Sequence, residues 1–179
     1  YVYEKGSEVA KDSETSFKWV KLAADQGMVI AQRTLGRKYQ FGIGAQTNFG
    51  QAFNWYLKAA KSGDADANYR IGTFYYSGSG VAQNYSEAAT YFRLAAEEGS
   101  ALGQSCFGYL CREGLGVAKD PAESVKWFRL ASDQGNAEAQ RNLGLAYETG
   151  NGIPKDGLEA AKYYRLAAEQ GDALAQNNL

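Results

Sequence analysis

The chain has 179 residues, and its 19 lysines and arginines nearly balance its 20 aspartates and glutamates, for a net charge of −1 at pH 7. A chain so close to neutral has no strong field for a polyanion, so nucleic acid is not an expected partner. There is no histidine, which removes the commonest general base and the commonest metal ligand, and there are only two cysteines. We expect no catalytic residue, no metal site and no cofactor.

Closely similar segments follow one another along the chain at a fixed spacing. Each ends in a glycine, and these glycines lie 36 residues apart, at Gly27, Gly63, Gly99, Gly135 and Gly171. A fixed period without insertions indicates stacked helical repeats rather than one globular core. We expect a single array over residues 1–179, in which both ends cut through a repeat. It comprises a partial repeat (1–27), four full repeats (28–63, 64–99, 100–135 and 136–171) and a partial repeat (172–179).

Each full repeat reads as two helices, A and then B. In the fourth repeat, helix A is predicted from about Ala137 to Thr149 and carries a glycine, Gly144, in mid-helix. The same glycine recurs in the other repeats, although glycine costs about 1 kcal/mol against alanine inside a helix. Its recurrence indicates that another helix passes too close there for a β-carbon.

Helix B is predicted to begin at a capping box, a polar residue followed three positions later by Glu or Gln. The boxes start at Asn84, Asp120 and Asp156, with a variant at Asn48 and a weaker one at Asp12. Residues 1–5 read as the tail of an earlier helix. Each B helix then carries two adjacent large side chains. In the pair Trp127/Phe128 we expect Trp127 to be buried, and we expect Arg129 to form an exposed pair with Asp133.

These features together resemble a known family. The pattern Ala-x-Ala-Gln-x-x-Leu-Gly-x-x-Tyr-x-x-Gly-x-Gly-Ile begins at Ala137, and Ala160–Gly171 reads AAKYYRLAAEQG. The combination is similar to the Sel-one-like repeat (SLR), a relative of the tetratricopeptide repeat, over essentially all 179 residues. The resemblance implies an all-α, right-handed superhelical solenoid of antiparallel helix pairs whose A helices line the concave side. Local departures are Glu8 for a loop glycine, Cys111 for a helix-A tyrosine and Gly103 for an alanine.

The same resemblance implies a non-enzymatic scaffold or adaptor that holds a protein or peptide through non-core positions of its A helices. These positions change between repeats while the core columns recur, and Tyr and Arg are enriched in binding hot spots. Tyr69, Tyr76 and Tyr109 would form the centre of the surface. The candidate binding residues are Arg33, Arg37, Asp66, Tyr69, Thr73, Tyr76, Ser105, Tyr109, Arg112 and Arg141.

Two other functions stay open. Some cysteine-rich relatives of this repeat are hydrolases that act on β-lactams, but this chain lacks their paired cysteines. A carbohydrate or cell-wall binder could instead stack sugars on the concave tyrosines. Cys106 and Cys111 are five positions apart on one predicted helix, beyond disulfide reach, and Cys111 is expected to be a small buried residue. No membrane span is visible, and the sequence indicates no compartment, partner identity or oligomeric state.

Overall fold

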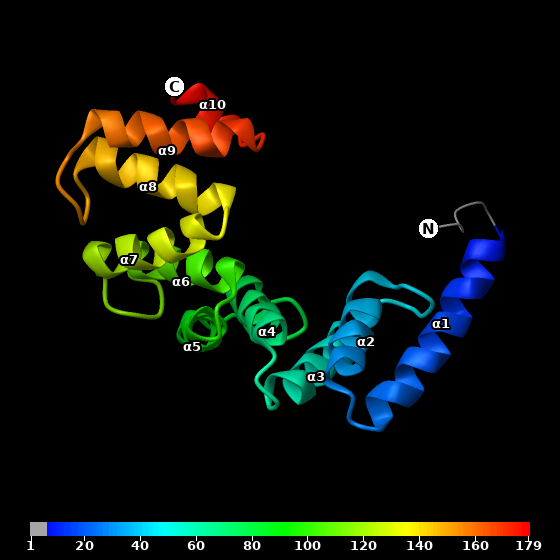
Figure 1. Ribbon diagram of the computed structural model, residues 1–179. Coiled ribbons are helices and arrows are strands. Elements are labelled where there is room, and N and C mark those ends of the chain that lie inside the picture. Colours follow the sequence, from blue (N-terminus) through cyan, green and yellow to red (C-terminus); the bar gives the residue numbers. More distant parts are fainter. Residues whose placement is uncertain (1–6) are drawn as a thin grey trace. The chain divides into compact units, whose positions relative to one another are not determined.

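The computed structural model describes residues 7–179, with side chains from Asp12 onward. The described residues form ten α-helices and no strand, which confirms the all-α fold (Figure 1). The helices are α1 (Ser7–Asp25), α2 (Val29–Phe41), α3 (Phe49–Ala60), α4 (Ala65–Ser77), α5 (Tyr85–Glu97), α6 (Ala101–Glu113), α7 (Pro121–Asp133), α8 (Ala137–Thr149), α9 (Gly157–Glu169) and α10 (Ala173–Asn177).

The helices fall into two compact units, of which the first ends at Gln83 and the second begins at Asn84. Within each unit, every helix packs against the next one in the chain, as stacked repeats require. The A helices are α2 and α4 in the first unit and α6 and α8 in the second, while α1, α3, α5, α7 and α9 are B helices. Figure 1 shows α8 and α9 lying side by side in opposite directions, the arrangement within one repeat.

The predicted capping boxes begin four of the B helices. The Asp120 side chain accepts a hydrogen bond from the Glu123 backbone N–H at 2.9 Å, and Asn48, Asn84 and Asp156 cap α3, α5 and α9 in the same way. The predicted start at Asp12 is wrong, because α1 runs without interruption from Ser7 to Asp25. Glu8 stands where the later repeats have their second loop glycine, which has a positive φ of 75° at both Gly44 and Gly80, so this turn of the loop is not favoured there. The predicted helix tail at residues 1–5 lies outside the described residues.

The core of each repeat is built around one aromatic ring of helix B. The second member of each aromatic pair is buried, and the exposed fraction of Tyr56 and Phe128 is 0%; in the pair Trp55/Tyr56 the first member is buried as well. The expectation for Trp127 is therefore wrong: this side chain is only partly buried. Its indole N–H donates to Glu123 Oε1 at 2.9 Å, and its ring packs edge-on against Phe107. Adjacent residues on a helix point about 100° apart, so Trp127 and Phe128 face different surroundings.

The mid-helix glycines face these buried rings. A β-carbon added at Gly144 would lie 2.6 Å from Cδ1 of Tyr164, and one added at Gly36 would lie 2.9 Å from the ring of Tyr56. The predicted close approach is confirmed, and what approaches is the aromatic side chain of the following B helix. The glycine thus makes room for the largest side chain of the repeat.

A recurring glutamine joins α2, α6 and α8 to B helices beside them, whereas α4 has an asparagine, Asn68, at this position. Gln104 Nε2 donates to the carbonyl of Ala96 at 3.2 Å, and its Oε1 accepts from Gln134 at 2.9 Å. Gln140 likewise accepts from Gln170 at 2.7 Å. Because Gln104 and Gln140 are buried, these bonds satisfy polar groups that would otherwise be costly. The glutamine of the repeat pattern is therefore part of the core.

Candidate binding surface on the A helices

The ten predicted binding residues lie on four A helices and divide between the two units. The first unit carries Arg33 and Arg37 on α2 and Asp66, Tyr69, Thr73 and Tyr76 on α4; the second carries Ser105, Tyr109 and Arg112 on α6 and Arg141 on α8. Each set is therefore described within its own unit.

A hollow of about 220 Å³ lies between α2 and α4 in the first unit and is lined by Arg33, Thr34, Arg37, Asp66 and Arg70. Arg33 forms ion pairs with Asp66 at 2.5 Å and with Asp64 at 3.4 Å. Arg37 is exposed, and neither Arg37 nor Arg70 has an acidic partner among the described residues. Two guanidinium groups without an ion pair among the described residues thus line this hollow, while its one carboxylate, Asp66, is paired with Arg33.

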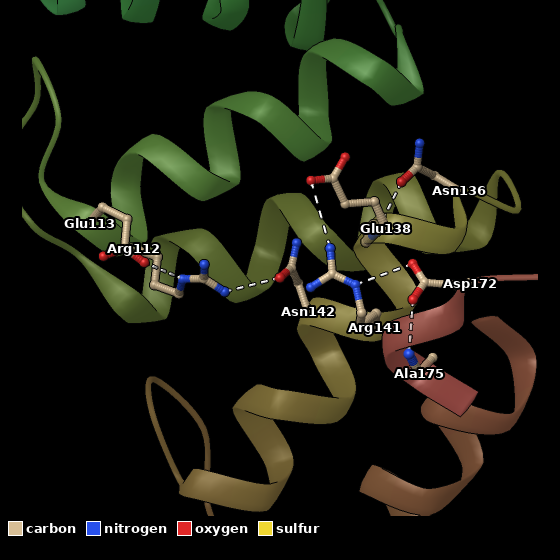
Figure 2. Close-up of polar contacts among 9 residues, drawn as sticks. Arg112, Glu113, Asn136, Glu138, Arg141, Asn142, Asp172 and Ala175 are labelled. Carbon is tan, nitrogen blue, oxygen red and sulfur yellow. Dashed lines mark hydrogen bonds and ion pairs between the residues drawn. The ribbon is translucent and has the colours of Figure 1, made fainter. Parts of the chain in front are cut away.

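Two of the predicted arginines tie one repeat to the next. Arg141 Nε contacts Asp172 Oδ2 at 3.1 Å, while Asp172 Oδ1 accepts the N–H of Ala175 and so caps α10 (Figure 2). Arg33 contacts Asp64, the cap of α4, in the equivalent way. Both arginines lie 31 residues before their aspartate. Their guanidinium groups are already occupied, so their first role is structural.

Ser105 is not a surface residue. Its side chain is 2% exposed, so the prediction that it contacts a partner is wrong. Thr73 is also tied to its own helix, because its hydroxyl donates to the carbonyl of Arg70 at 2.6 Å. Tyr109 is partly buried and packs against the core cluster around Phe128.

At one A-helix position that varies between repeats, the type of residue matches the buried aromatic ring that it faces. Where the ring is a tyrosine, the A helix supplies an acceptor: Tyr56 donates to Gln40 at 2.8 Å, and Tyr164 donates to Glu148 at 2.6 Å. Where the ring is Phe128, the same position is Arg112, whose guanidinium carbon lies 6.0 Å from the ring centroid. Variation at this position therefore reflects packing as well as any surface role.

A larger hollow, of about 400 Å³, lies in the second unit toward the C-terminal ends of α6 and α8. Arg112 spans it: Nε donates to Glu113 at 2.7 Å, and Nη1 donates to Asn142 Oδ1 at 3.0 Å (Figure 2). The hollow is also lined by the apolar side chains of Leu145 and Ala146 and by Lys119, which carries a positive charge. Arg112 is thus the predicted residue that the structure places in this hollow. Sequence reasoning did not single out Asn142.

The described residues contain no group of acidic, histidine or cysteine side chains that could hold a metal ion, and among them no helix has both the length and the apolar character needed to cross a membrane. The two thiols are not activated. Burial raises the pKa of Cys106 to about 12 and that of Cys111 to about 11. Reactive cysteines have lowered thiol pKa values instead.

The repeat pattern matches the family model of the Sel1 repeat at residues 1–28, 29–64, 65–100, 101–136 and 137–172. The chain belongs to the Sel1 repeat family. These matches cover nearly the whole sequence and name the family that the sequence resembles. No curated protein matches the chain at a significant level.

Solved Sel1 repeat structures resemble the chain. A protective antigen of uropathogenic Escherichia coli with an SLR fold is 38% identical, with a TM-score of 0.87, over 90% of this chain and 35% of its own. A Sel1 repeat protein from Oxalobacter formigenes is 36% identical, also with a TM-score of 0.87, over 94% of this chain and 69% of its own. The chain thus spans about a third of the length of the Escherichia coli antigen.

Helicobacter pylori cysteine rich protein B is a more distant structural neighbour. It is 24% identical, with a TM-score of 0.59, over 75% of this chain and 97% of its own. At this identity the likeness shows the fold alone. Sel1 repeat proteins are generally non-catalytic scaffolds for protein interactions.

Proposed function

We propose that this chain is a non-enzymatic scaffold that binds a protein or peptide on the surface of its A helices. The observation that carries the proposal is the hollow between α2 and α4, where Arg37 and Arg70 have no acidic partner among the described residues. Arginine is one of the side chains that dominate binding energy in protein interfaces, particularly where it is paired with an acidic group of the partner. The ligand that suits this hollow is an acidic segment of a protein.

Aromatic side chains add an apolar contribution beside these arginines. Tyr69 is partly buried, and the guanidinium carbon of Arg70 lies 5.4 Å from its ring centroid. A tyrosine that keeps part of its ring accessible supplies contact area at a low cost in conformational entropy. The surface therefore combines a fixed aromatic face with unpaired positive charge. Tyr76 lies two turns further along the same helix and extends this face.

The proposal can be tested without knowing the natural partner. Peptides would be selected by display against the immobilised chain, and a purified peptide would be titrated into the ¹⁵N-labelled protein. We expect acidic peptides to be enriched and to shift the amide resonances of α2 and α4 more than those of α1 and α3. Shifts confined to the B helices would contradict the proposal. If no peptide bound and the chain instead bound sugars on a glycan array, the carbohydrate-binding function would replace this proposal.

A further inference from the structure

Asn142 is a buried polar side chain whose hydrogen bonds are only half satisfied. The residue is 2% exposed, and its Nδ2 has no partner among the described residues. The orientation of its carboxamide is fixed by Arg112, because a guanidinium can only donate and must therefore face Oδ1. A buried N–H group without an acceptor is unfavourable, because the hydrogen bond it made to water in the unfolded chain is not replaced. Asn142 lines the hollow of the second unit, where a ligand could supply that acceptor.

Arg112 brings a second donor to the same hollow. Its Nε and Nη1 are engaged by Glu113 and Asn142, while its Nη2 has no acceptor among the described residues. The two bonds hold the guanidinium plane in position across the space between α6 and α8, as Figure 2 shows. A donor that is already held in place loses little freedom when a ligand binds. The hollow therefore offers two positioned N–H donors.

The charges of the lining select the kind of acceptor. Arg112 and Lys119 contribute two positive charges and Glu113 one negative charge, so these residues leave a net charge of +1. A single carboxylate would neutralise this charge and has oxygens for both donors. Leu145 and Ala146 provide an apolar wall beside it. The volume of about 400 Å³ lies within the range of roughly 300–1,000 Å³ that is usual for ligand pockets.

We infer that this hollow is a subsite for a peptide carboxylate, which accepts hydrogen bonds from Asn142 Nδ2 and Arg112 Nη2 while a neighbouring apolar side chain packs on Leu145. The inference rests on the proposed function and adds the chemical group that is recognised in the second unit. The carboxylate can belong to a chain terminus or to an acidic side chain. The structure offers the same two donors to either source.

The probes are three short peptides of defined sequence: acetyl-Ala-Ala-Leu with a free carboxylate, the same peptide with a terminal amide, and acetyl-Ala-Glu-Leu amide. Each would be titrated into the ¹⁵N-labelled chain. We expect the free carboxylate to shift the side-chain amide of Asn142 and to bind at least about tenfold more tightly than its amide. Tighter binding of the free terminus than of the glutamate peptide identifies a chain terminus as the ligand, and the reverse identifies an acidic side chain. Equal binding of the acid and both amides would overturn the inference.

The decisive variant is Asn142→Asp. It keeps an acceptor for Arg112, and so preserves the contact between α6 and α8, but it replaces the Nδ2 donor with a negative oxygen. We expect at least about a tenfold loss of carboxylate binding with the helical CD spectrum unchanged. Asn54→Asp is the matched control, because Asn54 is exposed on α3 in the other unit, and it should bind as the unmodified chain does.

Carboxylate binding that survives Asn142→Asp would overturn the inference. If Asn142→Asp instead failed to fold, Arg112→Gln would test the other donor, and undiminished binding by that variant would equally overturn it. Failure here is distinguishable from failure of the proposed function. Displayed peptides that still shift the resonances of α2 and α4 would leave the scaffold proposal standing while removing the carboxylate subsite.

Discussion

At the scale of single residues, the two members of the pair Trp127/Phe128 have different roles. Phe128 is fully buried, with the guanidinium of Arg112 near its ring and Gly108 packed against it. Trp127 keeps part of its surface accessible and satisfies its indole N–H on its own helix. The sequence shows two large residues side by side but not which of them faces the core. That choice depends on the rotation of the helix relative to both neighbours.

Phe128→Ala should therefore be more damaging than Trp127→Ala. Truncating a fully buried phenylalanine costs about 3–5 kcal/mol, whereas a partly exposed tryptophan loses less buried area and leaves a smaller cavity. Urea denaturation of the two variants would measure the difference. Equal free energies of unfolding would show that the two side chains contribute alike. The predicted ion pair of Arg129 with Asp133 is wrong, because the Arg129 guanidinium donates instead to the Tyr147 hydroxyl at 3.1 Å. Arg129→Ala, which removes this exposed hydrogen bond, should change stability little.

The buried titratable groups predict a loss of stability at alkaline pH. Burial raises the thiol pKa of Cys106 to about 12 and that of Cys111 to about 11, compared with about 8.5 in an unfolded chain. The folded state thus holds these protons more tightly, and its stability is complete below about pH 8.5 and falls above it. Each thiol contributes up to about 1.4 kcal/mol per pH unit. Burial also raises the pKa of Tyr56 to about 12, which adds to the fall above about pH 10.

The measurement is the free energy of unfolding from urea titrations between about pH 7.5 and pH 10. A Cys106→Ala, Cys111→Ala double variant serves as the control and should lose most of the slope below pH 10. A constant free energy of unfolding over this range would contradict the prediction. A slope that survived in the double variant would show that burial of the thiols does not cause the loss of stability.

At the scale of helices, the packing of A on B depends on the missing β-carbon of the mid-helix glycine. Tyr164, which faces Gly144, cannot easily move away, because its ring is 2% exposed and its hydroxyl donates to Glu148 at 2.6 Å. Alanine at Gly144 would gain about 1 kcal/mol of helix propensity but would overpack this contact, at a cost of typically 1–3 kcal/mol.

We expect Gly144→Ala to lower the midpoint of thermal unfolding. Gly157→Ala is the matched control: Gly157 lies in the first turn of α9, and a β-carbon added there meets nothing within 4 Å. The control should leave the midpoint unchanged or raise it. A stabilised Gly144→Ala variant would show that the ring of Tyr164 has room to move.

At the scale of the whole molecule, the period and the capping boxes predicted the all-α fold and four of the B-helix starts. The contacts between helices were not predicted, because they join residues 16 positions apart within a repeat or about 30 positions apart in successive repeats. The sequence nevertheless carries evidence of these contacts in paired columns, that is, pairs of repeat positions whose two residues match each other chemically. An arginine stands 31 residues before an aspartate cap at Arg33/Asp64 and Arg141/Asp172, and an acceptor faces each buried tyrosine at Gln40/Tyr56 and Glu148/Tyr164.

These paired columns also explain why the candidate site was predicted only in part. Variation among A-helix positions suggested a binding surface, yet Arg33 and Arg141 vary together with their caps, and Ser105 is buried. Arg37 is exposed without an acidic partner among the described residues, and Arg112 lines a hollow. Asn142 was missed because its significance depends on an unsatisfied hydrogen bond, which no residue pattern reveals.

Charge reversal tests most directly whether the A helices bind an acidic protein segment. The affinity of one display-selected acidic peptide would be measured for Arg37→Glu and for Lys18→Glu. Lys18 is an exposed cation on the B helix α1 of the same unit, so both variants change the net charge by the same amount. We predict that Arg37→Glu weakens binding at least about tenfold while Lys18→Glu leaves it nearly unchanged. Equal affinities for the two variants would contradict the claim.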